Sequence, residues 1–345
     1  MKHLLDWLDV DDASWNQCIQ DALLHGLDLQ KDAGLHTGKS VALVFFNDSL
    51  RTRVSMELAA GSLGAQPVTI TPGSGTWGFS WEKGKPMDGK EAEHIQEAVG
   101  VLSRYADAIG VRLFASGTDL QADMTDAHLR QFASYSSVPV LNLESVSRHP
   151  CQALADAAVL TNHFGGRPQT KKLVLSWTYH PKALPMAVPH STLLMASRLG
   201  MDVTLARPRG FELDPDVMDS ARRAAATHGG SIHETDNLAA AADGAQIIYA
   251  KSWGASLRYS DRDGESKLRD SRRNWRITSQ LMSATKEAHF MHCLPVRRGV
   301  VVDDEVIDGP RTLHLDQSEY RLHAQKAILN WLWDKSTMVS SGNRT

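Results

Sequence analysis

The sequence predicts an α/β protein with two lobes, each a parallel β-sheet flanked by helices. Three observations lead to this prediction. Short apolar runs rich in β-forming residues alternate with segments of helical periodicity along most of the chain. The chain has 345 residues, enough for two cores of ordinary domain size. A long helical stretch after Pro150 divides the alternation into two series of similar length.

The first series begins with an apolar run at residues 41–46, bounded by Gly38 and Asn47, which we expect to be a buried strand. Helical sequence follows at 53–60 and is closed by glycines. The other elements expected in this series are a strand at 67–71, a helix at 91–105, and strands at 109–114 and 138–143.

The second series begins with a helix at 151–164, which ends at two glycines, and continues with strands near 173–177, 203–206 and 247–250. The expected domains are therefore 1–150, completed by a C-terminal helix at about 320–338, and 151–319. The tail from Ser340 to Thr345 is polar, and we expect it to be disordered. Because ligands bind at the carboxyl ends of parallel strands, we expect an active site in the interdomain cleft.

Composition excludes several classes of protein. Hydrophobic residues make up 42% and charged residues 22% of the chain, and the formal net charge is −3. This balance does not favour a nucleic-acid surface or a basic membrane patch. No apolar run approaches the roughly 18 residues that span a bilayer, and the N-terminus lacks a signal-peptide core. Three widely spaced cysteines form no disulfide or zinc pattern, so the sequence predicts a cytoplasmic protein.

The strongest local signal is the segment 45–53, where a buried strand is followed by a helix. The N–H groups and positive dipole end of such a helix bind anions. Ser49 and Thr52 add hydroxyl donors, and Arg51 adds a fork suited to phosphate oxygens. The alternative is that Ser49 only caps the helix while the arginines are solvated. Two further residues favour an anion-binding site over simple capping. Arg112 lies at the end of another predicted strand, and His149 lies just before Pro150, where the long helix begins.

A glycine pattern at 73–78 formally matches the dinucleotide fingerprint. The residues after it, Trp77-Gly-Phe-Ser-Trp81, are a poor start for a helix. We therefore reject the fingerprint and, with it, a nicotinamide dehydrogenase.

Four motifs resemble the aspartate and ornithine carbamoyltransferases: Ser-x-Arg-Thr-Arg at 49–53, Arg112, His149-Pro-x-Gln152 and His292-Cys-Leu-Pro295. The resemblance runs from about residue 40 to the C-terminal helix. It implies a first domain that binds carbamoyl phosphate and a mechanism that needs no metal or cofactor. It also implies that Ser49, Leu50, Arg51 and Thr52 hold the phosphate, that Arg112, His149 and Gln152 hold the carbamoyl end, and that Thr52, Arg112 and His149 stabilise the oxyanion.

The second lobe departs from the pattern of ornithine transcarbamylases. Those enzymes carry acidic and small residues where the free α-ammonium of ornithine binds, whereas this chain has Lys251 at the matching position. A cation there would pair with an α-carboxylate instead. Segments 178–182, 249–253, 292–298 and 319–323 are similar to the N-acetylornithine and N-succinylornithine carbamoyltransferases. That resemblance implies an N-acylornithine acceptor and a place in arginine biosynthesis. It assigns Glu144, His180, Lys251 and Arg297 to the acceptor, Cys293 to catalysis, and Cys293, Leu294 and Arg321 to carbamoyl phosphate.

Alternatives remain for two of these residues, since Cys293 could be a small buried filler and His180 a turn residue. In this family the loop with Trp77 reaches the carbamoyl phosphate site of a neighbouring subunit, which implies a homotrimer with shared sites. Ala92 matches a position where acetyl-type enzymes carry Glu and succinyl-type enzymes carry Pro. Because Ala92 removes a charge that would repel a succinyl carboxylate, we expect N-succinylornithine first and N-acetylornithine second. The alternative functions are those of an ornithine carbamoyltransferase and of a non-catalytic phosphate-binding protein.

Overall fold

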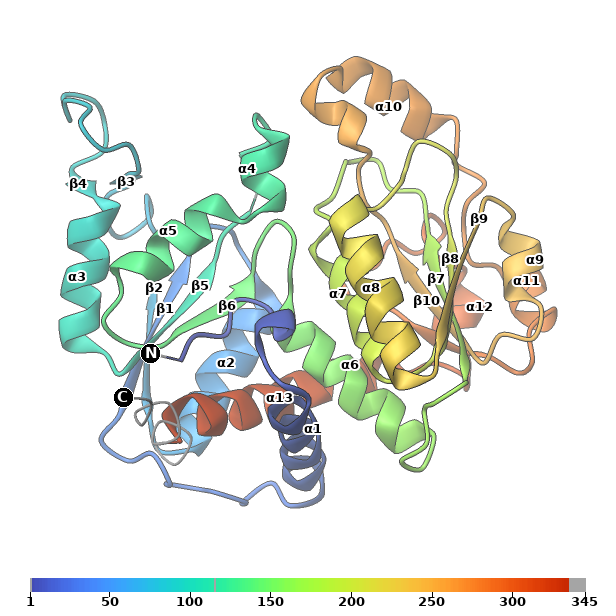
Figure 1. Ribbon diagram of the computed structural model, residues 1–345, viewed down its shortest axis with the longest axis horizontal. Helices are drawn as coiled ribbons and strands as arrows, with labels where there is room; N and C mark the ends of the chain where they lie inside the picture. Colours follow the sequence, from blue (N-terminus) through green and yellow to red (C-terminus); the bar gives the residue numbers. More distant parts are fainter. Residues whose placement is uncertain (1, 115, 335–345) are drawn as a thin grey trace. The chain divides into compact units, whose positions relative to one another are not determined.

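The computed structural model describes residues 2–114 and 116–334. The tail from Ser340 to Thr345 and the last positions of the expected C-terminal helix, 335–338, lie outside the described residues. Parallel sheets flanked by helices confirm the predicted fold class (Figure 1).

The described residues form two compact units. The first contains residues 2–112, 129–143 and 321–334, and the second contains 113–114, 116–128 and 144–320. These units differ from the expected domains because the segments 113–128 and 144–150 group with the second unit. The C-terminal helix groups with the first unit from Arg321 onward.

The sheet of the first unit has the strand order β2-β1-β5-β6. Strand β1 pairs in parallel with β2 and β5, in a register that sets Phe45 opposite Arg112. Gly110 leaves room for this packing, because a Cβ there would lie 2.9 Å from Leu143 Cδ1. The strands are β1 (Ser40–Phe45), β2 (Gln66–Ile70), β5 (Ala108–Arg112) and β6 (Val140–Glu144), with a small separate pair, β3 (Phe79–Ser80) and β4 (Glu93–His94).

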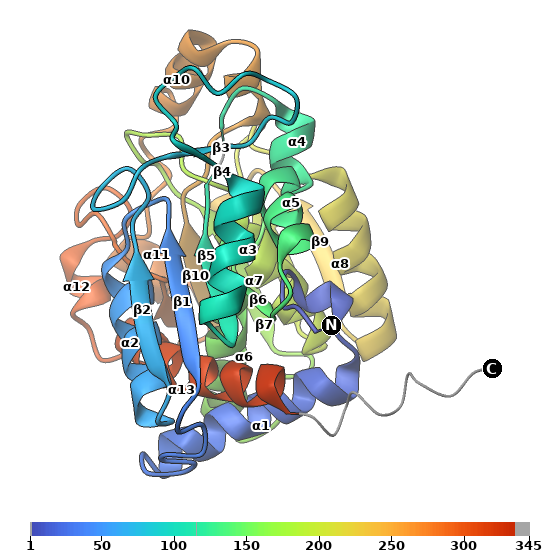
Figure 2. The same cartoon turned by 90° about the vertical axis from the view of Figure 1, so that its left-hand side faces the viewer.

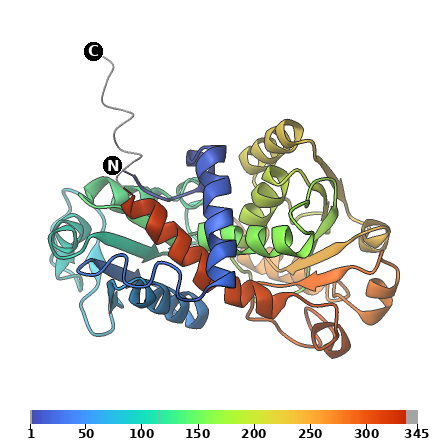
Figure 3. The ribbon, with the colours of Figure 1, turned by 90° about the horizontal axis from the view of Figure 1, so that it is seen from below.

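Helices cover both faces of this sheet. The chain moves from β1 outward to β2 and then back across β1 to β5, so right-handed crossovers place α2 and α3 on opposite faces. Figure 2 shows α3 and α5 together on one face. On the other face α13 crosses α1 (Figure 3), and Lys326 of α13 donates to the Leu29 carbonyl. The bounds are η1 (Trp7–Asp9), α1 (Asp12–Leu27), α2 (Leu50–Ser62), α3 (Ile95–Tyr105), α4 (Leu120–Met124), α5 (Ala127–Tyr135) and α13 (His314–Trp333).

The sheet of the second unit is also parallel, in the order β11-β10-β7-β8-β9. Helices α7 and α8 pack together, and α6 packs on α7. Its strands are β7 (Lys172–Trp177), β8 (Asp202–Ala206), β9 (Ser231–Thr235), β10 (Ile247–Lys251) and β11 (His289–Met291). Its helices are α6 (Pro150–His163), α7 (Ala187–Arg198), α8 (Pro215–His228), α9 (Leu238–Ala242), η2 (Ser256–Tyr259), α10 (Arg262–Asp270), α11 (Ser279–Ser283) and α12 (Asp304–Ile307).

Several elements differ from the sequence prediction or were not expected, and three of them have a clear local cause. The helix expected at 91–105 begins only at Ile95, because residues 93–94 pair with β3 and the His94 ring caps the helix by accepting from Gln96 N–H. Strand β9 is a half-exposed edge strand with polar residues, and β11 has three residues, so neither shows a long apolar run. None of the helices in residues 2–114 and 116–334 is long and apolar enough to cross a membrane.

Candidate active site

The strand–helix corner expected at residues 45–53 is present at the carboxyl end of β1. Ser49 is the N-cap of α2, and its Oγ accepts a hydrogen bond of 3.2 Å from the backbone N–H of Thr52. Leu50 is 75% exposed and Arg51 is half-buried, whereas Thr52 is buried. The capping role of Ser49 is therefore real. A cap of this kind satisfies only part of the N–H groups of the first turn of a helix, and helix N-termini are places where anions bind.

Two buried arginines belong to the same unit as this corner. Arg321 of α13 donates from Nη2 to the Thr52 hydroxyl at 2.9 Å. Arg112 ends β5, the strand next to β1, and its carbonyl accepts from Phe46 N–H at 3.0 Å. Arg321 thus places a guanidinium at the first turn of α2, and Arg112 lies at the carboxyl end of the strand next to β1.

The loop between β2 and α3 carries Trp77 and Ala92. Trp77 is 54% exposed, and its Nε1–H donates to Glu93 at 2.6 Å. Ala92 is also exposed. The base of the loop is anchored to the corner by ring packing of Phe46 against Phe79 and Trp81. The structure therefore holds the ends of this loop while its tip, with Trp77, faces solvent.

In the second unit, Glu144 and His149 lie next to each other. Glu144 ends β6, and its Oε2 lies 3.4 Å from His149 Nε2. His149 is buried at the N-cap of α6, and its backbone N–H donates to Ser191 Oγ at 2.8 Å. Pro150 occupies the first helical position, where a missing N–H costs nothing. The end of β6 and the start of α6 therefore bring the Glu144 carboxylate and the His149 ring into contact.

Gln152 lies one turn further along α6 and belongs to a buried network around Asp156. The Asp156 carboxylate accepts hydrogen bonds of 2.8 Å from Gln152 Nε2, Gln317 Nε2 and the Tyr249 hydroxyl. Burial, and next the Asp156 charge, raise the pKa of Tyr249 well above its usual value, so the phenol keeps its proton and donates.

The predicted pair Cys293 and Leu294 follows β11 after one intervening residue, His292. The Gln317 amide oxygen accepts from His292 N–H at 2.8 Å, and the His292 ring accepts from Leu294 N–H at 2.9 Å. Leu294 has a left-handed φ of 56°, which is uncommon for a branched side chain. Cys293 is buried. This turn is therefore held in one conformation by Gln317 and the His292 ring.

Both ring nitrogens of His180 have hydrogen-bond partners. Arg297 Nε donates to His180 Nε2 at 3.0 Å, so Nε2 must accept. His180 Nδ1 lies 2.9 Å from the Lys182 carbonyl and 3.0 Å from the Lys182 backbone N–H. Burial lowers the pKa of His180, and the charges of Arg297 and Lys251 lower it further. The His180 ring therefore contacts both the turn at Lys182 and the side chain of Arg297.

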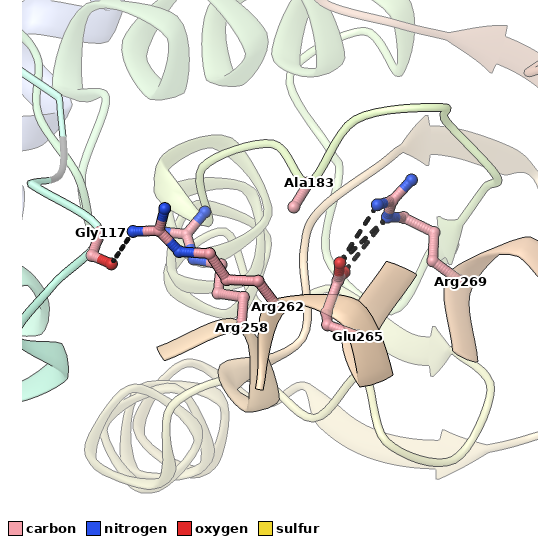
Figure 4. A pocket seen from close by; sticks show the side chains of 6 residues that line it. All are labelled: Gly117, Ala183, Arg258, Arg262, Glu265 and Arg269. Carbon is pink, nitrogen blue, oxygen red and sulfur yellow. Dashed lines mark hydrogen bonds and ion pairs between the residues drawn. The ribbon is translucent and has the colours of Figure 1, made fainter. Parts of the chain in front are cut away.

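Helix α10 fastens the loops that follow β7 and β10. Arg269 forms a buried ion pair with Glu265, at 3.2 Å, and donates to the His180 carbonyl at 3.1 Å. Figure 4 shows this pair in the wall of a pocket of about 280 Å³, with Arg262 reaching the Gly117 carbonyl. Lys251 ends β10, and its carbonyl accepts from Thr178 N–H at 3.1 Å. These contacts fix the backbone that carries His180 and Lys251.

Comparison with known proteins agrees with this geometry. Residues 2–162 match the family model described as aspartate/ornithine carbamoyltransferase, carbamoyl-P binding domain, and residues 186–332 match the Asp/Orn binding domain of the same family. This chain belongs to the aspartate/ornithine carbamoyltransferase family. It is 43% identical to the N-acetylornithine carbamoyltransferase of Xanthomonas axonopodis pv. citri (strain 306), over 100% of this chain and 99% of the relative.

Other members of the carbamoyltransferase family match over most of their length. The N-succinylornithine carbamoyltransferase of Bacteroides fragilis (strain 638R) is 34% identical, over 91% of this chain and 97% of the relative. A crystal structure of acetylornithine transcarbamylase complexed with acetylcitrulline is 42% identical, with a TM-score of 0.94, and covers 97% of this chain and 100% of that chain. A variant of the N-acetyl enzyme complexed with carbamyl phosphate and N-succinyl-L-norvaline is 43% identical, with a TM-score of 0.93, over 96% of this chain and 100% of that chain.

Sequence reasoning missed Asp156, Tyr249, Gln317 and the pair of Glu265 and Arg269. One signal was available for Asp156, because it lies four residues after Gln152 and so on the same face of a predicted helix. The partners contributed by Tyr249 and Gln317 come from distant segments and have no local signature.

Proposed function

We propose that this carbamoyltransferase moves the carbamoyl group of carbamoyl phosphate to the δ-amino group of an N-acylated ornithine, giving N-acylcitrulline and phosphate. The observation that carries the proposal is the positive charge at the carboxyl ends of the strands in the second unit. Lys251 and Arg297 stand there beside a neutral His180. Such a set suits an α-carboxylate, and it opposes the free α-ammonium of ornithine.

The phosphate group is assigned to the corner at α2. Ser49, Leu50, Arg51 and Thr52 offer backbone and hydroxyl donors with one guanidinium, and Arg321 holds the Thr52 hydroxyl in place. Helix N-termini and arginine forks are strong partners for phosphate oxygens. In this proposal Trp77 contributes to the carbamoyl phosphate site of a neighbouring subunit.

The reaction is a nucleophilic substitution at the carbamoyl carbon. The neutral δ-amine forms a C–N bond, an oxyanion develops, the C–O bond to phosphate breaks, and the phosphate takes up the proton released by the amine. Thr52, Arg112 and His149 are the proposed donors to that oxyanion. Donors placed in advance around such a charge are worth about 3–4 kcal/mol each. Gln152, Cys293 and Leu294 surround the carbamoyl end.

The acceptor is assigned to the second unit. Glu144 would accept the N–H of the acyl amide, while Lys251 and Arg297 pair with the α-carboxylate. His180 supports Arg297 as a hydrogen-bond acceptor and carries no charge of its own. These residues divide the acceptor into an amide end and a carboxylate end.

Two observations bear on the acyl group. Overall identity is higher to an N-acetylornithine enzyme, 43%, than to an N-succinylornithine enzyme, 34%. The acyl pocket decides this preference more directly, and Ala92 places no carboxylate there. A relative in which one glutamate is replaced by alanine crystallised with N-succinyl-L-norvaline. We therefore favour N-succinyl-L-ornithine, with N-acetyl-L-ornithine second.

The assembly is proposed to be a homotrimer in the cytoplasm, with sites shared between subunits. Three apolar residues on one stripe of α2, Leu50, Val54 and Leu58, are 75%, 45% and 58% exposed. Exposed apolar stripes of this kind mark protein interfaces. The solvent-facing Trp77 is a second apolar contact available to a neighbouring copy.

The decisive experiment supplies carbamoyl phosphate with ornithine, N-acetylornithine or N-succinylornithine and identifies the product by mass. Formation of N-acylcitrulline from an acylated acceptor, with no citrulline from ornithine, supports the proposal. Efficient turnover of ornithine itself would make the protein an ornithine carbamoyltransferase. Tight binding of carbamoyl phosphate without any product would indicate a non-catalytic binding protein.

A further inference from the structure

Asp156 is a fully buried carboxylate outside the residues assigned so far. Its exposed fraction is 0%, and it lies on α6 one turn after Gln152. Three neutral side chains from α6, α13 and β10 donate to it: the Gln152 and Gln317 amides to Oδ1, and the Tyr249 hydroxyl to Oδ2. Burying a carboxylate costs free energy even when it is hydrogen-bonded, so its position calls for a reason.

A carboxylate dictates which way a neighbouring amide points. An ionised carboxylate only accepts hydrogen bonds, so both glutamines must turn their NH₂ groups toward it. Their carbonyl oxygens then face the opposite way. For Gln317 that oxygen accepts from the backbone N–H of His292 at 2.8 Å. For Gln152 the same rule aims the carbonyl oxygen away from Asp156, as an acceptor on the first turns of α6.

The hydrogen bonds of Gln317, which we call the Gln317 branch, extend from Asp156 to the turn after β11. His292 is held through Gln317, and its ring accepts from Leu294 N–H at 2.9 Å. The backbone of Cys293 and Leu294 therefore depends on the same carboxylate as Gln152. One buried charge orients two separate groups that surround the carbamoyl end in the proposed site.

We infer that Asp156 is a positioning residue for recognition of the carbamoyl NH₂ group. It keeps the Gln152 carbonyl oxygen toward that NH₂ and, through Gln317, fixes the turn that carries Cys293 and Leu294. A flipped Gln152 would set NH₂ against NH₂, two donors with no acceptor. The inference rests on the proposed function, in which Gln152 contacts the carbamoyl group.

The test compares two ligands that differ only in the carbamoyl group. Asp156→Asn keeps the shape of the side chain but can both donate and accept, so it no longer dictates the amide direction. The affinities of carbamoyl phosphate and inorganic phosphate are measured by calorimetry. We expect carbamoyl phosphate to bind at least tenfold more weakly, about 1.4 kcal/mol, and phosphate to stay within twofold. Phosphate is unaffected because its proposed partners, Ser49–Thr52, belong to the other unit.

Tyr249→Phe is the matched control. It removes one hydrogen bond from the same buried carboxylate but leaves the charge and both glutamines. We expect a lower Tm with an unchanged ratio of the two affinities. Equal losses for both ligands in Asp156→Asn, or no loss for either, would overturn the inference.

A second variant covers the case in which Asp156→Asn does not fold. Gln317→Leu removes the hydrogen bonds of Gln317 to Asp156 and His292 but leaves Asp156 and Gln152 in place, and we expect the ratio of carbamoyl phosphate to phosphate affinity to fall several-fold. An unchanged ratio in that folded variant overturns the inference. Failure of the wild-type protein to carbamoylate any acylornithine would instead overturn the proposed acceptor, because the two binding constants need no acceptor.

Discussion

The guanidinium of Arg321 donates to the hydroxyl of Thr52 across a separation of 269 residues, at a distance of 2.9 Å, with both side chains buried. Thr52 lies in the first turn of α2, where the proposed phosphate binds. The contact fixes the hydroxyl and brings a second positive charge to the corner. A residue of the last helix thus shapes a site whose other parts come from the first strand and helix.

This contact predicts the behaviour of Thr52→Val. Valine has nearly the same shape but no hydroxyl, so Arg321 loses a buried acceptor, at a cost of about 1–3 kcal/mol in the free energy of unfolding. Carbamoyl phosphate should also bind more weakly. Thermal unfolding and calorimetric titration measure the two effects. Thr52→Ser keeps the hydroxyl and should resemble the wild type, and a Thr52→Val protein as stable as wild type would contradict the role given to this contact.

The exposed Trp77 predicts complementation between subunits. Arg51→Ala and Trp77→Ala subunits should each be inactive alone, whereas hybrid trimers contain some sites with both residues intact. Mixing the two proteins after mild dissociation should restore part of the activity, with hybrids verified by mass. The control mixes Arg51→Ala with a double variant carrying both changes, which cannot form an intact site. Verified hybrids without activity would refute shared sites.

Ala92 predicts the acyl preference. We expect trace turnover of ornithine and a higher kcat/KM for N-succinylornithine than for N-acetylornithine. Ala92→Glu should reverse that order on the order of tenfold to a thousandfold, because a like charge in a partly desolvated pocket costs a few kcal/mol. Ala92→Gln, which adds the same size without the charge, should change the order much less. A wild-type preference for N-acetylornithine would refute the succinyl assignment alone.

His190 predicts a loss of stability in acid. Complete burial lowers its pKa to about 3, and its ring contacts the Ser147 carbonyl and the Asp214 N–H. The neutral ring is favoured in the folded state, while the unfolded chain takes up a proton near pH 6.5. The free energy of unfolding should therefore fall as the pH drops from about 6.5 toward 3, by about 1.4 kcal/mol per pH unit for this group.

Urea unfolding at several pH values measures that slope. His190→Gln should reduce the slope by about 1.4 kcal/mol per pH unit, which corresponds to one proton. The control variant His233→Gln, at an exposed position, should leave the slope unchanged. Part of the slope should remain in His190→Gln, because burial lowers the pKa of His25 in the first unit to about 4. An identical slope in wild type and His190→Gln would contradict the assignment.

Local sequence alone determined the alternation of strands and helices and the corner at Ser49. A buried strand such as β1 is an apolar run bounded by turn residues, and an N-cap serine acts within four residues, so both leave their mark in adjacent positions. The family resemblance added residues such as Lys251 and His180 that periodicity could not single out. The edge strand β9 escaped prediction because it is half exposed and needs no apolar run.

Only the tertiary structure decided which side chains meet. Asp156 contacts Tyr249 and Gln317 across 93 and 161 residues, and Thr52 meets Arg321 across 269. These pairings depend on strand order, crossover direction and the return of the last helix to the first unit. The contact of His180 with Arg297 likewise joins residues 117 positions apart. Hydrogen bonds between distant side chains impose no spacing on the chain, because each partner is set by packing and not by its neighbours in sequence.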